Sequence, residues 1–139
     1  MTQELARGHD ALRASMHDFA QIMDRSGPQD MPLIAQKRIA FSQLYRDHMA
    51  KEDAAVRELA RPSLSAEAEQ AVRDHNRAIV TLFLRYSEHL KHWTPAMIAQ
   101  DWTGYRAAVK QLQDSLRERM AWEEKHLHPV LARPSRRPA

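Results

Sequence analysis

One stretch decides the fold: residues 41–59, which read FSQLYRDHMAKEDAAVREL. Its core-facing positions step by fours and threes along the list Phe41, Tyr45, His48, Glu52, Ala55 and Leu59. This spacing is typical of the apolar seam of an amphipathic helix in a bundle. A histidine and a glutamate occupy two successive seam positions, so we expect both side chains to face the core.

Three further segments repeat this rhythm. The first runs from Leu5 to Met23, the third from Ala68 to Trp93 and the fourth from Ile98 to Val130. Breaks rich in Pro or Gly separate the segments at residues 26–32, 61–63 and 94–95, and no strand pattern competes. The sequence therefore predicts an all-α fold, an antiparallel up-down-up-down four-helix bundle, whose fourth segment is one long helix bent near Gly104.

Length and composition set limits on the class of protein. A chain of 139 residues fits one domain, and we expect a bundle over 1–132 followed by a basic, Pro-rich, disordered tail over 133–139. The net charge of +3 comes from acids and bases mixed along each segment, which does not indicate nucleic-acid binding. No apolar run is long enough to span a membrane and residues 1–20 lack a signal-peptide core, so we expect a cytoplasmic protein with no membrane partner.

Polar residues interrupt the apolar seam in all four segments. They are His9 in the first, His48 and Glu52 in the second, His75 and His89 in the third, and Arg119, Glu123 and His126 in the fourth. In an antiparallel bundle, residues equally far from a shared turn lie at the same height. His9 and His48 each lie about twenty residues from the first turn, and Glu52 and His75 each about a dozen from the second. We therefore expect one polar layer that contains His9, His48, Glu52, His75 and the turn from Arg119 to Glu123.

The polar groups of such a layer need binding partners, because a buried polar group without a partner costs roughly 2 kcal/mol or more. The chain has no cysteine, so any metal must be held by nitrogen and oxygen. Imidazoles and carboxylates are suitable ligands for iron, manganese or zinc. The alternative is a metal-free layer of hydrogen bonds in which Arg119 pairs with Glu52 or Glu123.

Four short motifs carry a family resemblance. They are His9-Asp10-Ala11-Leu12-Arg13, the HxxxE of His48 and Glu52, Asp74-His75-Asn76-Arg77, and Trp122-Glu123-Glu124 with the following Leu127-His128-Pro129. In this order they resemble the hemerythrin-like domains of the HHE cation-binding class. The resemblance implies a four-helix bundle with a non-haem di-iron site that binds, stores or senses oxygen, or serves iron and redox homeostasis. It also implies that His9 and His48 ligate one iron, that His75 serves the other, and that Glu52 and Glu123 bridge the two.

Two positions depart from the family pattern. Arg119 stands where the family has a histidine four residues before the glutamate, and Ile79 stands where a second histidine would follow His75. The expected outcomes are a single metal at His9, His48, Glu52 and Glu123, an uneven pair of metals, or a site without metal.

Function can then be stated as two hypotheses. The leading one is a protein that binds one or two iron ions, or another divalent metal, and takes dioxygen, nitric oxide or another small diatomic ligand. This hypothesis does not require catalysis. The alternative is a metal-free helical interaction domain in which Arg119 replaces a metal ligand, and the oligomeric state is not indicated.

The remaining polar candidates receive other interpretations. His126 follows Glu123 at ExxH spacing and could supply a replacement nitrogen. His89 lies about four turns from His75, too far to share its metal, and is expected to be a core histidine. His17, His92 and His128 fall off the seam and are expected on the surface, while Glu124 is either a hydrogen-bond acceptor behind the site or solvated.

Overall fold

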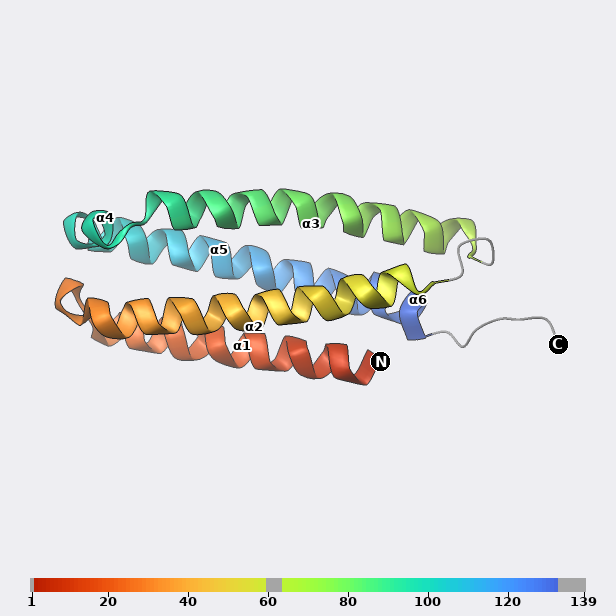
Figure 1. The fold of residues 1–139 in the computed structure, drawn as a ribbon, viewed down its shortest axis with the longest axis horizontal. Coiled ribbons are helices and arrows are strands. Elements are labelled where there is room, and N and C mark those ends of the chain that lie inside the picture. The colour runs from red at the N-terminus through yellow and green to blue at the C-terminus, as the bar shows by residue number, and fades with distance from the viewer. Residues whose placement is uncertain (1, 60–63, 133–139) are drawn as a thin grey trace.

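The computed structural model describes residues 2–59 and 64–132, and all regular structure within these residues is helical. The four long helices are α1 (Thr2–Arg25), α2 (Met31–Arg57), α3 (Ala66–His92) and α5 (Trp102–Trp122). The short elements are η1 (Pro28–Asp30), α4 (Pro95–Gln100), the π-helical segment η3 (Glu123–Leu127) and α6 (His128–Ala132). The predicted all-α class is thus confirmed. Figure 1 shows the four long helices lying along the long axis of the molecule, with the chain reversing direction between successive ones.

Two helix starts follow the expected capping chemistry. The Ser65 hydroxyl accepts a hydrogen bond from the Ala68 N–H at 3.0 Å and begins α3. The Thr94 hydroxyl accepts from the Met97 N–H at 3.2 Å, with Pro95 in the first turn of α4. A side-chain oxygen at these positions satisfies an amide that has no partner within the helix, which fixes where the helix begins.

The fourth segment differs from the single helix predicted for it. It breaks at Asp101, whose backbone leaves the helical region with φ −141° and ψ 70°. The Asp101 carboxylate accepts from the Gly104 N–H at 2.9 Å and begins α5. The prediction of a bend at Gly104 was therefore wrong by three residues, because an aspartate can cap a new helix where a glycine only weakens one.

Some predictions fall on residues that the structure does not describe. The predicted turn at 61–63 and the predicted tail at 133–139 both lie outside the described ranges. Within 2–59 and 64–132, no helix combines the length and the apolar character needed to cross a bilayer.

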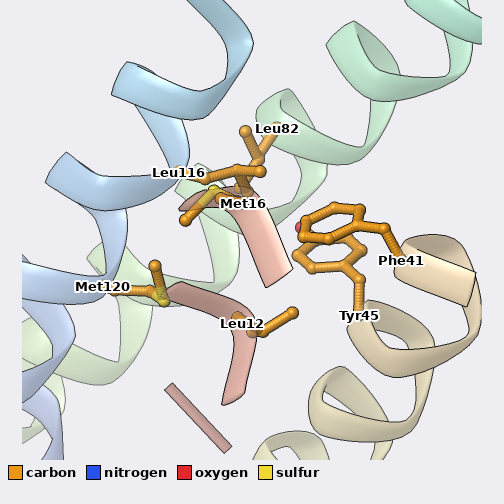
Figure 2. Packing of buried hydrophobic residues seen from close by; sticks show 7 residues of the cluster. All are labelled: Leu12, Met16, Phe41, Tyr45, Leu82, Leu116 and Met120. Atoms are coloured by element: carbon orange, nitrogen blue, oxygen red, sulfur yellow. The ribbon is translucent and has the colours of Figure 1, made fainter. Parts of the chain in front are cut away.

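The core is layered along the bundle, and this layering positions the site. Figure 2 shows an apolar cluster to which α1, α2, α3 and α5 all contribute, made of Leu12, Met16, Phe41, Tyr45, Leu82, Leu116 and Met120. A smaller cluster of Val56, Val72 and Leu127 lies further along the same helices. Along α2, His48 and Glu52 fall between Tyr45 of the first cluster and Val56 of the second. The polar layer is therefore enclosed between two apolar layers.

His89 lies away from this layer, as expected for a core histidine. Its ring stacks on Tyr105 with the ring centroids 5.9 Å apart. Burial, together with the nearby charges of Arg38 and His92, lowers the pKa of His89 to about 4. The imidazole is therefore neutral at pH 7, and protonating it in acid favours the unfolded chain.

This predicts a loss of stability in mild acid. Because the folded pKa of His89 lies below its unfolded value, its contribution is fully present above about pH 6.5 and is lost as the pH falls towards 4. For a half-buried group we expect about 1 to 3 kcal/mol. The difference in unfolding free energy between wild type and His89→Phe, measured by urea denaturation at pH 7 and pH 4.5, should shift by this amount in favour of the variant. An unchanged difference would show that the pKa of His89 is the same in the folded and the unfolded chain.

Candidate metal centre

Four of the five predicted site residues have side-chain ligand atoms that lie close together. A ligand atom from each of His9, His48, Glu52 and Glu123 lies within 4.8 Å of all the others, and this group could hold a metal ion. His9 comes from α1, His48 and Glu52 lie one turn apart on α2, and Glu123 opens the π-helical segment η3. All four side chains are buried, with exposed fractions between 0% and 5%. The predicted convergence in depth is therefore present for these four residues.

The carboxylates of Glu52 and Glu123 each face in two directions. On one side, Glu52 Oε2 lies 3.6 Å from His48 Nε2 and 3.8 Å from His9 Nε2, and Glu123 Oε1 lies 3.1 Å from His9 Nε2. On the other side, Glu52 Oε1 lies 3.6 Å from His75 Nε2 and Glu123 Oε2 lies 3.3 Å from His75 Nδ1. The fifth predicted residue, His75, is therefore brought to the layer but lies on the opposite side of the two carboxylates.

Arg119 occupies that opposite side. Its Nε donates to Glu123 Oε2 at 3.1 Å, and its Nη2 lies 3.2 Å from His75 Nδ1. The guanidinium carbon also lies 4.2 Å from the centre of the Trp122 ring, a cation–π contact that holds it in place. A guanidinium is always charged and only donates, so this contact uses the lone pair of His75 Nδ1. A permanent cation thus stands on the far side of the two carboxylates from His9 and His48.

Two buried polar atoms on the layer have no hydrogen-bond partner in the described residues. They are Nε2 of His48 and Oε1 of Glu52. Leaving such atoms unpaired in the interior costs about 1 to 3 kcal/mol each. Both are good metal-binding atoms, and their residues belong to the group of four.

A carboxylate behind His9 fixes the orientation of its ring. His9 Nδ1 lies 2.7 Å from Glu124 Oε2, and Arg13 Nη2 donates to Glu124 Oε1 at 2.9 Å. If Nδ1 of a neutral ring donates to Glu124, the lone pair of Nε2 faces Glu123 Oε1, and the two acceptors need a proton or a metal ion between them. A carboxylate on the outer nitrogen is the usual arrangement behind a metal-binding histidine. Of the two interpretations of Glu124, the structure favours the acceptor behind the site.

The charge distribution of the layer favours a cation. Burial alone would raise the pKa of Glu123, but contacts with the imidazoles of His75 and His9 outweigh it and hold the pKa far below its usual range. Burial lowers the pKa of His9, but its hydrogen bonds to Glu123 and Glu124 outweigh this effect and leave it raised. Both shifts reflect buried negative charge that is stabilised by a nearby positive one.

His128 is a site residue that the sequence analysis placed on the surface, and that interpretation was wrong. Its side chain is buried, and His128 Nε2 lies 3.2 Å from Glu52 Oε2. The cause is the π-helical turn, in which the His128 N–H bonds to the carbonyl of Glu123, five residues earlier. In an α-helix, residues five apart are rotated by about 140°, whereas the wider π turn brings them back towards one face.

The same turn removes His126 from the site. His126 is exposed and packs on Trp122 with the ring centroids 5.1 Å apart, so it supplies no replacement nitrogen. A signal in the sequence was Pro129, which has no N–H to bond to the carbonyl of Lys125. A proline inside a helical pattern marks a local change of helix geometry, and here that change exchanges His126 for His128.

A small cavity adjoins the centre. It has a volume of about 10 Å³ and is lined by His9, His48, Arg119 and Glu123 on one side and by apolar side chains of the core on the other. This is the lower limit for holding one water molecule. The cavity therefore has room for about one water-sized ligand beside the four candidate ligands.

Gly8 sets the position of His48. A Cβ atom at Gly8 would clash with His48 Nδ1 and approach His48 Cε1 to 3.0 Å. Gly8→Ala should therefore push the imidazole out of line and weaken metal binding by about 10- to 100-fold, even though alanine favours the helix.

Competition with a chromogenic chelator would measure the affinity of the Gly8→Ala chain. Ala11→Ser, on the exposed face of the same helix, should leave the affinity unchanged. Equal affinities for Gly8→Ala and wild type would mean that His48 does not bind the metal from this position.

Comparison with protein-family models, with curated proteins and with solved structures gave no match for this chain. The geometry of the centre therefore carries the argument that a metal ion binds here.

Proposed function

We propose that this chain is a hemerythrin-like protein that binds a single non-haem iron ion within an up-down-up-down four-helix bundle. The observation that carries the proposal is the buried Nε2 of His48, which has no hydrogen-bond partner within the described residues and belongs to a group of four convergent ligands. Buried polar atoms in native proteins are almost always hydrogen-bonded, so an unpaired one calls for an explanation. Coordination of a metal ion by this nitrogen would remove the cost of leaving it unpaired.

The donor set fits the proposed ion. His9 and His48 offer imidazole nitrogens and Glu52 and Glu123 offer carboxylate oxygens, a mixture suited to Fe²⁺ and also to Mn²⁺ or Zn²⁺. His128 stands next to this group through its contact with Glu52 and is the candidate for a fifth ligand. Iron is preferred among these metals because the order of motifs along the chain resembles the hemerythrin-like class.

Arg119 is the reason for proposing one ion and not two. Its guanidinium lies between Glu123 and His75, on the far side of the carboxylates from His9 and His48. A second cation there would meet a permanent positive charge and an imidazole that is already engaged. In this proposal Arg119 neutralises the outer carboxylate charge that a second iron neutralises in a di-iron site.

Bound iron would supply an open coordination position that can take a small diatomic ligand such as dioxygen or nitric oxide. The chain's own residues restrict that ligand and its surroundings. The adjoining cavity of about 10 Å³ admits only a very small molecule. Leu12, Tyr45 and Met120 close the layer on one side and keep bulk water away. Glu124 holds the His9 ring so that Nε2 points into the centre.

A second candidate is a metal-free helical interaction domain. The contacts of Arg119 with Glu123 and His75 favour it, because they satisfy part of the layer without a metal. It leaves His48 Nε2 unexplained.

Metal content distinguishes the two candidates. Protein purified with Fe²⁺ present should contain about one iron per chain by elemental analysis, and its visible spectrum should lack the absorption of an oxo-bridged pair. His128→Ala should weaken iron binding, whereas His126→Ala, two residues away but exposed, should not. Wild-type protein that retains no iron, manganese or zinc would sink the metal proposal and leave the interaction domain.

A further inference from the structure

α3 carries an apolar stripe that faces away from the core. Val80, Phe83 and Leu84 are exposed by 60%, 61% and 58%, and Leu90 extends the stripe at 37%. Phe83 and Leu84 follow Val80 by three and four residues, and Leu90 follows Phe83 by seven, which places all four on one side of the helix. The buried residues His75 and Leu82 lie on the other side, so α3 has two apolar faces where a helix at the edge of a bundle needs one.

Single exposed apolar residues are ordinary, but a contiguous set is not. Ile39 on α2, exposed by 62%, is an isolated case. The α3 stripe places three large side chains within five residues of each other, which marks an interaction surface. Figure 1 shows α3 running along one edge of the molecule for most of its length, so another helix can reach it.

We infer that this stripe binds a second copy of the chain, with α3 packed antiparallel against α3 of the partner about a two-fold axis. An axis at the level of residue 82 sets Val80, two residues before it, against the partner's Leu84, two residues after it. Phe83 lies next to the axis, so the two copies of this ring contact each other. The same patch then serves both chains, as a two-fold interface requires.

One pair of charges at the edge of the stripe is complementary under the same symmetry, whereas Arg73 and Lys91, nine residues to either side of the axis, are like-charged and lie at the two ends of the contact. Arg77 lies five residues before the axis and Glu88 six residues after it, on the same edge of the stripe. The mismatch of one residue is about 1.5 Å along the helix, within reach of these long side chains. Both residues are exposed, and neither forms an ion pair within residues 2–59 and 64–132. Each dimer would contain two Arg77–Glu88 pairs.

This pair favours a second copy as the occupant. An unrelated helix would not require a cation and an anion at nearly equal distances from the centre of the stripe, whereas a second copy requires both.

The oligomeric state tests the inference. Analytical ultracentrifugation of the full chain at tens of micromolar should show a species with twice the mass of one chain. Phe83→Glu should raise the dissociation constant by at least about 100-fold, because it buries unpaired charge at the axis. Ile39→Glu, equally exposed but off the stripe, should leave the dimer intact.

A pair of charge-reversing substitutions distinguishes loss of the dimer interface from misfolding. Glu88→Arg alone should weaken the dimer, and adding Arg77→Glu to it should restore the dimer by recreating the pairs with reversed sign. A wild-type chain that stays monomeric at hundreds of micromolar would overturn the inference. Equal weakening by Ile39→Glu and Phe83→Glu, or no recovery in the double variant, would also overturn it.

Discussion

Loading the chain with Fe²⁺ is expected to raise its melting temperature by about 10 °C over the chelator-treated protein. An ion present at about 1,000 times its dissociation constant stabilises the state that binds it by about 4 kcal/mol. For a domain of this size, each kcal/mol corresponds to about 2 to 4 °C. The effect should be large because the ion would satisfy His48 Nε2, which is buried and unpaired without it.

His48→Ala should abolish this shift in melting temperature. It removes one of the four convergent ligands, and differential scanning calorimetry with and without chelator measures the result. His17→Ala is the matched control, since His17 is an exposed histidine on α1 and should keep the full shift. An equal shift in His48→Ala and wild type would place the stabilising ion elsewhere on the chain.

Arg119→His is expected to raise the metal content from about one ion per chain to about two. The substitution removes the cation that lies between Glu123 and His75 and releases the lone pair of His75 Nδ1. It also supplies a second imidazole one turn before Glu123. Glu52 Oε1 and Glu123 Oε2 already face that side, so two nitrogens and two oxygens would be available.

Elemental analysis and the visible spectrum measure the change, and a pair of irons should add oxo-bridged absorption. Arg119→Lys is the control, because it keeps a positive charge at the same position and should remain at about one ion. A metal content that stays at one in Arg119→His would contradict the role assigned to Arg119.

Much of the centre follows from the spacing of residues alone. His9, His48, Glu52 and Glu123 all occupy seam positions. Equal distances from shared turns place His9 level with His48 and Glu52 level with His75, whereas Glu123 counts as about two turns further from the third turn than His75. The structure brings these four together within 4.8 Å. Periodicity was sufficient here because α1, α2 and α5 keep regular geometry up to Trp122.

Predictions from residue spacing were wrong where the helical repeat changes. Beyond Trp122 the π turn adds a residue, so His128 and not His126 enters the layer. At Asp101 a capping carboxylate breaks a segment whose apolar rhythm continues unchanged. Both are local departures of the backbone that hydrophobic spacing does not record.

The helical class and the four seams follow from the order of residues along the chain, because both depend only on the repeat of 3.6 residues per turn. How the polar residues divide between the two sides of Glu52 and Glu123 depends on the tertiary structure. It placed His9 and His48 on one side and His75 with Arg119 on the other. That division depends on the direction of side chains across helices, which the order of residues along the chain does not specify.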